Sequence, residues 1–443
     1  MNGFAITRYL PTGELDITFG EEGIVIVDMG LRTSGVSVKI RNDNSLIVCG
    51  KGGIEKVLIA HIRSNGDIDL NSNGSEAKSI SSFMNDQERP ILRNVMFTQA
   101  NQVFSQGFIA SKTRTQKPSL FIRVSIIITR ILKFFRLLPS SIPSLRVLAV
   151  GDIGELVSPR LIALSGYKIN GDVDQSFSNN GVNIQHSGSD LIEVAASDYN
   201  SSQGRTIVIT HKHDNNLPVL RAAKFLDNGT LDGFIFYHAW LTGNNTPPWN
   251  IIPQDVMFRN GIFIVGRAFQ QNVRDALIIV RIKENGSTDL NFGNNDGVGF
   301  IPVDDSRAEF NSVESDARSR IIVAGKVLNN FCLARFNPNG KFDEDFNQNE
   351  IATAHFDGIF SCAKVAKIDS VISERIVVAG EAGFQFALAR YLENGSIDTT
   401  FGTNGKVLTT ILSGHDSEIS DIAFDNQQRI VAVGGVNLKI IID

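Results

Sequence analysis

The stretch HKHD, residues 211–214, is the sequence's candidate for metal chemistry. Side chains alternate along a strand, so His211 and His213 would share one face, with Asp214 beside them. Imidazole and carboxylate groups are ligands that Zn²⁺ accepts in proteins. No further ligand stands at a suitable spacing, and the alternative is a strand that ends in a polar loop. We therefore expect no metal and no cofactor, and keep these three residues as the candidates if a metal is bound.

Motifs for covalent or phosphate chemistry do not occur. The sequence has no GxxxxGK[ST], no GxSxG and no GxGxxG after a strand. The Asp-x-Asp stretches at 65–74 and 169–181 lack the closing Glu of an EF-hand, which favours turn capping over calcium binding. No catalytic residue is assigned, and enzyme activity stays open.

Both tryptophans, Trp240 and Trp249, lie in one insertion, residues 237–253. Exposed aromatic loops on a rigid scaffold are good contact surfaces, so we take this pair as the candidate binding residues. The alternative is that they pack this loop onto its own sheet.

A repeat of about 55 residues must position these candidates. Its first phrase is an apolar strand, an Asn-Gly turn, an Asp and a Phe-Gly pair. The best copies read FAITRYLPTGELDITFG (4–20), ALIIVRIKENGSTDLNFG (276–293), FCLARFNPNGKFDEDF (331–346) and LARYLENGSIDTTFG (388–402). We expect the Asp to accept backbone N–H bonds in the loop and the Phe to plug that loop into the core.

A second phrase, of the form RIVVAG, falls between the first ones and occurs eight times. Runs of four to eight β-branched and aromatic residues between Gly, Asn and Asp are typical of strands and turns. One unit thus supplies about four short strands, too few to bury both faces alone. Closure into a ring solves this problem and predicts an all-β, β-propeller fold over residues 1–443.

We expect eight four-stranded blades, with seven as the alternative because the step from 107 to 151 is short. The chain starts with a first-phrase strand, and its last hairpin lacks a successor. The ring should therefore close by pairing of residues 4–9 with 429–435, although 437–443 could compete for that edge.

The LARY-x-x-NG-x-x-D-x-x-FG string and the upstream RIxVAG strand resemble the bacterial delta-60 repeat. The resemblance covers nearly the whole chain except 109–144. It implies a propeller, and it implies neither an enzyme activity nor any site residue.

Residues 117–144 break the pattern, because they are apolar and basic and contain no acid. A degenerate or frame-shifted blade segment is the favoured interpretation. A basic amphipathic helix over 126–138 on a membrane surface is the second, and a transmembrane helix is disfavoured by four interrupting cations.

Composition narrows the function classes. A formal net charge of −5 provides no basic field for nucleic acid. The three cysteines (Cys49, Cys332 and Cys362) stand at positions where other copies have small apolar residues, so buried thiols are expected. No signal peptide is evident, which predicts a cytoplasmic protein or one exported by a non-classical route.

These observations favour a monomeric, non-catalytic binding scaffold that recognises protein or carbohydrate through its propeller-face loops. The alternative is a hydrolase or lyase with a site in the central channel, and a lesser one is peripheral membrane contact through 126–138. Acids and histidines converging on the channel would favour the enzyme, whereas a lining of Gly, Ala and Val would count against it.

Overall fold

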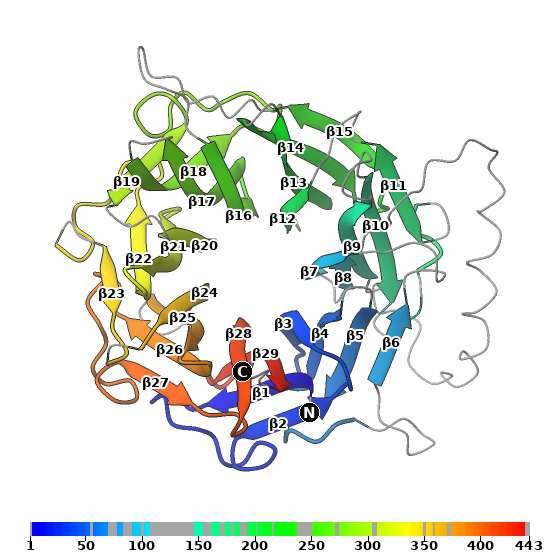
Figure 1. The fold of residues 1–443 in the computed structure, drawn as a ribbon, viewed down its shortest axis with the longest axis vertical. Helices are drawn as coiled ribbons and strands as arrows, with labels where there is room; N and C mark the ends of the chain where they lie inside the picture. Colours follow the sequence, from blue (N-terminus) through cyan, green and yellow to red (C-terminus); the bar gives the residue numbers. More distant parts are fainter. Residues whose placement is uncertain are drawn as a thin grey trace, which may run out of the picture.

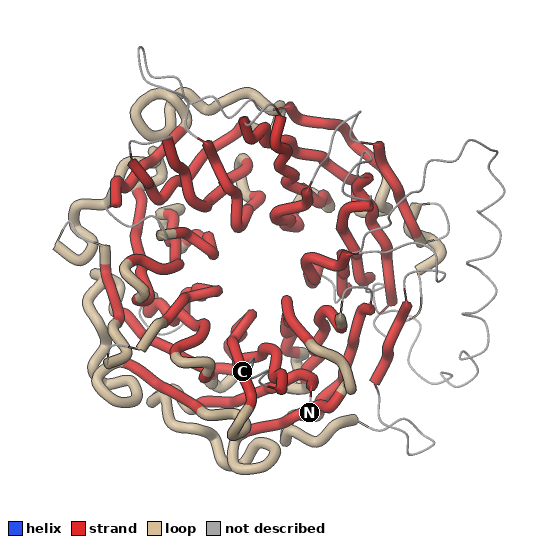
Figure 2. The backbone as a smooth tube through the Cα atoms, in the orientation of Figure 1, coloured by secondary structure: helices blue, strands red, loops and turns tan. Residues whose placement is uncertain are grey.

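The computed structural model is an all-β ring of small sheets around a central channel (Figures 1 and 2). None of the described residues forms a helix long and apolar enough to cross a membrane. The described residues are 2–53, 56–69, 78–82, 91–98, 102–106, 146–153, 161–168, 172, 174–178, 181–186, 193–200, 202–214, 217–236, 250–270, 274–303, 308–348, 351–357, 359–369 and 374–438.

Six sheets of the described chain are four-stranded antiparallel blades. In five of them the strand that comes first in the sequence lies at the channel, and in the blade that joins the chain ends the channel strand is β28 (His415–Phe424) (Figure 1). Three of them are β3 (Thr33–Ile40), β4 (Leu46–Gly52), β5 (Lys56–Ile62), β6 (Lys78–Ser82); β12 (Glu193–Asn200), β13 (Arg205–Asp214), β14 (Leu217–Leu226), β15 (Leu231–Phe236); and β16 (Asn250–Phe258), β17 (Ile262–Gln270), β18 (Arg274–Ile282), β19 (Val298–Val303). The next two are β20 (Glu309–Ser315), β21 (Ile321–Val327), β22 (Asn330–Phe336), β23 (Ala352–Ala354); and β24 (Ser361–Asp369), β25 (Arg375–Ala382), β26 (Gln385–Tyr391), β27 (Lys406–Thr409).

The sixth blade joins the two ends of the chain, as predicted. Its order is β2 (Ile24–Asp28), β1 (Asn2–Tyr9), β29 (Ile430–Leu438) and β28 (His415–Phe424). The β1–β29 register runs from Asn2 opposite Asn437 to Tyr9 opposite Ile430. The edge that 437–443 could have contested is thus occupied by β1; residues 439–443 lie outside the described part.

The expected count of eight four-stranded blades is wrong, and so is the alternative of seven. Beside the six such blades the described chain has one five-stranded sheet, in the order β11 (Val182–His186), β10 (Leu161–Lys168), β8 (Gln102–Gln106), β7 (Ile91–Thr98), β9 (Arg146–Ile153). Strands β8 and β9 are the two second-phrase copies around the irregular stretch. Both pair with β7 and with β10, so two copies that sequence spacing assigned to separate blades share one sheet. Residues 107–145, including 126–138, lie outside the described part.

The repeat's Asp and Phe have the predicted roles. An Asp carboxylate accepts the amide N–H two residues later at 3.0–3.2 Å in five copies: Asp16, Asp174, Asp289, Asp343 and Asp398. The matching phenylalanines are fully buried: Phe19, Phe177, Phe292, Phe346 and Phe401. Asp69 and Asp232 likewise form ion pairs with arginines of their own blades, Arg63 and Arg205.

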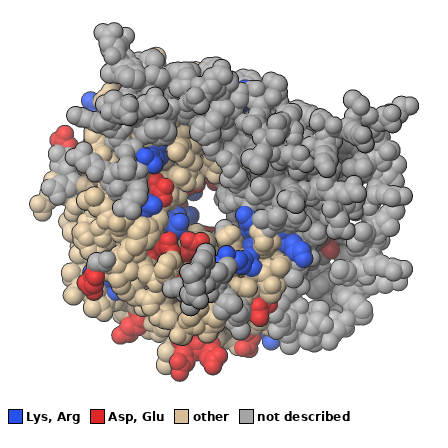
Figure 3. Space-filling view, viewed as in Figure 1, with Lys and Arg blue, Asp and Glu red and all other residues tan. Residues whose placement is uncertain are grey.

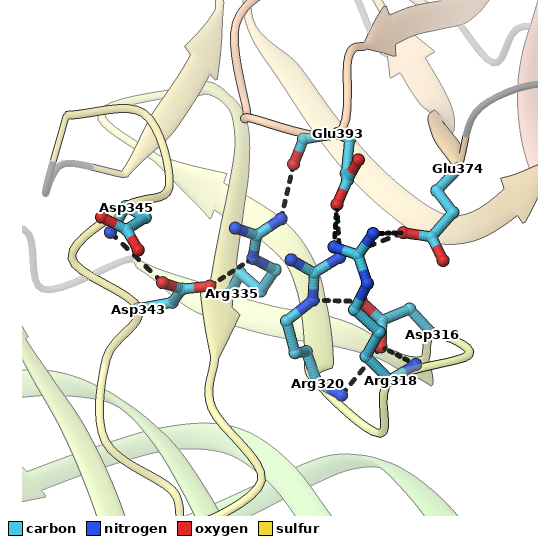
Figure 4. A network of polar contacts seen from close by, with 8 residues as sticks. All are labelled: Asp316, Arg318, Arg320, Arg335, Asp343, Asp345, Glu374 and Glu393. Atoms are coloured by element: carbon cyan, nitrogen blue, oxygen red, sulfur yellow. Dashed lines mark hydrogen bonds and ion pairs between the residues drawn. The ribbon is translucent and has the colours of Figure 1, made fainter.

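The same loop joins each blade to the next. The residue after the Phe donates its N–H to a carbonyl in the following blade's Asn-Gly turn at 2.6–2.8 Å, at Gly20–Asn65, Ser178–Asn228, Gly293–Asn339, Asn347–Asn394 and Gly402–Thr12. In three of these copies an arginine of the first-phrase strand adds a second link. Arg335, for example, binds Asp343 at 2.6 Å and donates to the carbonyl of Glu393 in the next blade (Figure 4). Its guanidinium also lies over the ring of Phe346.

A neighbouring polar cluster joins the same two blades. Arg320 contacts Asp316 of its own turn at 2.5 Å and reaches Glu374 and Glu393 of the next blade at 3.1 and 3.0 Å (Figure 4). Its side chain is mostly buried, so these contacts are screened less than surface pairs. This face of the ring is therefore held by charge-assisted bonds as well as by apolar packing.

Candidate ligand site in the central channel

The channel wall is built from the innermost strands, and each of those described carries a β-bulge. A bulge inserts one extra residue, bends the strand and re-aims its side chain. The inserted residues that line the channel are Ala195, Gln254, Asn311, Lys364 and Ser420. The repetition of this irregularity gives each of these five blades one extra side chain at the channel.

The channel holds a cavity of about 930 Å³. Its charged lining is mixed, as the acidic and basic side chains around the central opening show (Figure 3). The acids are Asp198, Asp255, Glu314, Asp316, Glu418 and Asp421, and the bases are Lys39, Arg259, Lys364 and Lys367. No histidine lines the cavity within the described part of the chain.

Short polar side chains connect neighbouring inner strands. Asp255 accepts the N–H of Val313 in the next blade at 2.9 Å and that of Val256 in its own strand at 2.8 Å. Asp421 accepts the N–H of Val38 across the closing junction at 3.1 Å. Equivalent bonds run from Ala366 N to Ser312 Oγ and from Phe258 N to Asp198 Oδ2. These groups close the inner ring, so their first role is structural.

Two of these carboxylates differ in acidity from ordinary aspartates. Burial in the ring raises the pKa of Asp198 to about 6 and that of Asp255 to about 7, against the backbone N–H bonds that lower both. The charge of Asp198 raises the pKa of Asp255 further. Both residues are half-buried and line the channel cavity. Near neutral pH, part of the population therefore carries a protonated carboxyl there.

A second group of charges lies within the cavity. Glu314 stands between Arg259 at 3.6 Å and Lys367 at 3.5 Å. Burial lowers the pKa of Lys367, but Glu314, Asp421 and Asp255 more than offset it and raise that pKa above its ordinary value. The Arg259 side chain is 62% exposed and its ion pair with Glu314 is long, so its guanidinium has donors to offer a ligand.

The sequence-predicted candidates lie elsewhere. His211, His213 and Asp214 fall at the end of β13, where they pair with Leu220, Pro218 and Leu217 in the hairpin to β14. That strand is the second of its blade, so its backbone does not form the channel wall, and nothing further is described of these side chains. Trp240 and Trp249 lie outside the described residues. Among those that are described, no group of three or more His, Cys, Asp and Glu could hold a metal ion.

Sequence reasoning missed the channel residues because they share no motif. The position after the bulge is Asp255, Ser312 or Asp421 in different blades, and only the hydrogen bond to the next strand is common to them. An alignment of the innermost strands on a polar residue followed by Val or Ile would have included four positions that bond to or across a neighbouring strand: Ser37, Asp255, Ser312 and Asp421.

Comparisons with known proteins agree with the fold. Residues 319–346 and 375–401 match the family described as "Domain of unknown function (DUF5122) beta-propeller". These segments are the second and first phrases of two adjacent blades. Together with the sheet topology, they make this chain a β-propeller repeat protein. No curated protein matches the sequence.

Several solved structures are similar over most of their length. A virginiamycin B lyase from Staphylococcus aureus with quinupristin has 9% identity, covers 97% of this chain and 99% of its own, and gives a TM-score of 0.44. A streptogramin B lyase has 10% identity, 98% coverage of each chain and a TM-score of 0.45. An alpha-L-arabinofuranosidase from Fusarium graminearum with an iminosugar inhibitor has 9% identity, coverage of 92% and 97%, and a TM-score of 0.40. Likenesses of this degree carry no argument about activity.

Proposed function

We propose that this protein is a binding propeller that takes a hydroxyl-rich small molecule, of the carbohydrate class, into its central channel. The carrying observation is the cavity of about 930 Å³ whose lining mixes carboxylate, amide, ammonium and guanidinium groups. That volume falls within the range of about 300–1,000 Å³ of small-molecule sites. Sugar hydroxyls both donate and accept hydrogen bonds, so they suit a cavity wall that carries both acceptors and donors.

The exposed wall residues favour such a ligand over an apolar one. Gln254 is exposed at its bulge, and its amide offers two donors and an acceptor. Glu314 can accept hydroxyl hydrogens while its two long ion pairs hold it in place. The mixed signs of charge also disfavour a strongly anionic ligand such as nucleic acid.

Calorimetric titration with a panel of neutral and acidic oligosaccharides tests this function. We expect Glu314→Gln and Gln254→Ala each to weaken the binding of a panel member about tenfold, the loss expected when one ligand hydrogen bond goes. Lys341→Ala is the matched control, because Lys341 is exposed in the Asn-Gly turn at the rim and does not line the cavity. Binding by none of the panel, or equal binding by all three variants, would remove the proposal.

A second candidate function, hydrolysis of a glycosidic bond, is favoured by the raised pKa of Asp255. A carboxyl with a pKa of about 7 can donate its proton to a leaving-group oxygen at neutral pH. Glu314 would then take a proton from the attacking water, whose oxygen forms the new bond to the sugar carbon. The leaving group departs as the alcohol, and the two carboxyls end with their proton exchanged.

Turnover separates this candidate from binding alone. With aryl glycosides as substrates, Asp255→Asn should abolish release of the aryl alcohol, and kcat of the unaltered protein should fall as pH rises through about 7. Ser312→Ala is the control, since Ser312 makes the equivalent link between blades without titrating. Sugar binding without measurable turnover would leave the binding function and eliminate the hydrolase.

We also propose that the chain is a delta-60 repeat protein. The support is the recurrence of the LARY-x-x-NG-x-x-D-x-x-FG string together with the roles of its Asp and Phe. A profile built only from those loop positions, searched against proteins of known structure, should recover other propellers and no unrelated folds.

A further inference from the structure

One face of the ring carries large apolar side chains in turns that disfavour them. The hairpin between β21 and β22 turns at Leu328 and Asn329, with φ of 49° and 62°. The hairpin between β25 and β26 turns at Gly383 and Phe384, with φ of 58° and 63°. Two-residue turns with two positive φ values favour Asn and Gly, because a bulky side chain is strained there.

Both apolar residues are also exposed, Leu328 at 66% and Phe384 at 53%. The backbone conformation of these turns thus disfavours both side chains, and neither side chain is buried. The corresponding turn of the β4–β5 hairpin begins with Gly53, which adopts φ of 60° without that strain. Strained residues held in an unfavourable conformation concentrate at functional sites.

The two turns form one continuous surface with the loop between them. Ser361 donates its N–H to the carbonyl of Asn329 at 2.9 Å, and Gly383 donates to the carbonyl of Phe360 at 3.1 Å. Ile359 and Phe360, 36% and 45% exposed, thus lie between Leu328 and Phe384. We name these four side chains the apolar ridge. Contiguous exposed apolar side chains of this kind mark interaction sites.

Acidic groups adjoin the ridge. Phe384 accepts the N–H of Ser417 at 2.9 Å, which places the neighbouring Asp416 beside it. Among the described residues, four acids interact here with two lysines: Glu309, Glu381, Asp416 and Glu418 with Lys326 and Lys364. Each lysine already contacts an acid, Lys326 with Glu309 at 3.3 Å and Lys364 with Glu418 at 3.7 Å. Burial and the charge of Glu418 raise the pKa of Glu381, so a cation placed between these two carboxylates would be favourable.

We propose that the apolar ridge and these acids form a docking surface for a protein segment that carries large apolar side chains next to Lys or Arg. The apolar side chains pack on Leu328 and Phe384, and the cation lies against Glu381 and Glu418. Anionic membranes do not suit the same surface, because the acidic excess repels them. This interaction goes beyond the channel ligand, although Glu418 and Lys364 border both surfaces.

The test uses the full chain and three synthetic fluorescent peptides. One alternates Phe with Lys, the second replaces each Lys by Glu, and the third replaces each Phe by Ser. By fluorescence anisotropy the Phe–Lys peptide should bind at least about tenfold more tightly than the other two. No binding of the Phe–Lys peptide, or equal binding of the Phe–Glu peptide, would overturn the proposal.

Variants separate docking from folding. The double variant Leu328→Asn/Phe384→Asn should weaken Phe–Lys peptide binding about tenfold while its melting temperature stays equal or rises, because Asn tolerates positive φ. Leu290→Asn is the control, since Leu290 is 60% exposed outside the ridge and should leave binding unchanged. Equal losses in the double variant and the control would contradict the assignment. Sedimentation provides one more outcome: a dimer that the double variant abolishes would make a second copy of this chain the occupant and overturn the partner proposed here.

Discussion

Gly13 lies against the ring of Phe401, although 388 positions separate the two in the sequence. A Cβ on Gly13 would come within 2.9 Å of two ring carbons of Phe401 and within 2.7 Å of the amide nitrogen of Gly402. That amide donates to the carbonyl of Thr12 at 2.7 Å. The first Asn-Gly-type turn of the chain is thus fitted onto the last Phe-Gly loop, and the contact fixes where the ring closes.

Substitution of this glycine should open the closing junction. Gly13→Ala combines a positive φ of 92° with a contact too close for a methyl group, and we expect a loss of more than about 2 kcal/mol in unfolding free energy. Gly30→Ala is the control, since Gly30 also has a positive φ, 67°, but has no atom within 4 Å of its Cβ position. Urea unfolding measures both. Equal losses would mean that backbone strain, not the contact with Phe401, makes Gly13 necessary.

The arginine of the first phrase should stabilise the folded protein through the shape of its guanidinium and not only through its charge. Arg390 binds Asp398 at 2.8 Å, donates to the carbonyl of Pro11 in the next blade and lies 4.5 Å from the centre of the Phe401 ring. Arg390→Lys keeps the charge but cannot make these contacts together, and should cost about 3 kcal/mol because the pair is buried. Arg63→Lys tests the same chemistry at the exposed pair with Asp69, where less than about 1 kcal/mol is expected. Similar unfolding free energies for both variants would count against this role.

Much of the fold could be predicted because the repeat fixes strands and turns locally. The spacing of Asn-Gly, Asp and Phe located the strands that precede them, and Asp398 and Phe401 have the roles assigned to them. The blade count could not be obtained in this way. Counting copies of RIVVAG identifies strands, but pairing decides which sheet each strand joins, and β8 and β9 pair with the same neighbours.

The channel residues were harder to predict, for a physical reason. A ligand site at the axis of a ring takes one or two side chains from each of several blades, so its members are spread from Lys39 to Asp421. The inner strands vary because a carboxylate or a hydroxyl can make the same bond to the next blade, as Asp255 and Ser312 do. The HKHD stretch was a candidate metal site because two histidines stand close together in the sequence. Its strand is the second in its blade, however, so it does not form the channel wall.

The three thiols should be unreactive in the folded protein. Cys49, Cys332 and Cys362 are free and buried, as predicted, and burial raises the pKa of each thiol. The thiolate is the reactive form, so a disulfide reagent such as DTNB should modify none of them over the time in which it modifies all three in urea. Rapid reaction of even one thiol in the native protein would contradict its placement between the sheets.

Stability should fall as pH rises from about 4 to about 8. The folded-state pKa values of Asp198 and Asp255, about 6 and about 7, lie above the ordinary value of 3.8. The folded protein therefore binds protons that the unfolded chain releases, and this contribution is fully present below pH 3.8 and lost through pH 6 to 7. Asp16 and Asp398 act oppositely, because hydrogen bonds and arginine neighbours lower their pKa values, but their contribution is lost only in stronger acid. Thermal unfolding followed across this pH range should thus show a maximum in mild acid.

The double variant Asp198→Asn/Asp255→Asn identifies the groups responsible. It keeps an oxygen that can accept the N–H of Phe258 or Val313 but does not titrate, so its melting temperature should change much less between pH 5 and 8. Ser312→Ala removes the equivalent link at Ala366 and should lower the melting temperature by the same amount at every pH. An unchanged pH profile in the double variant would assign the effect to other groups and would also remove the basis for Asp255 as a proton donor in the channel.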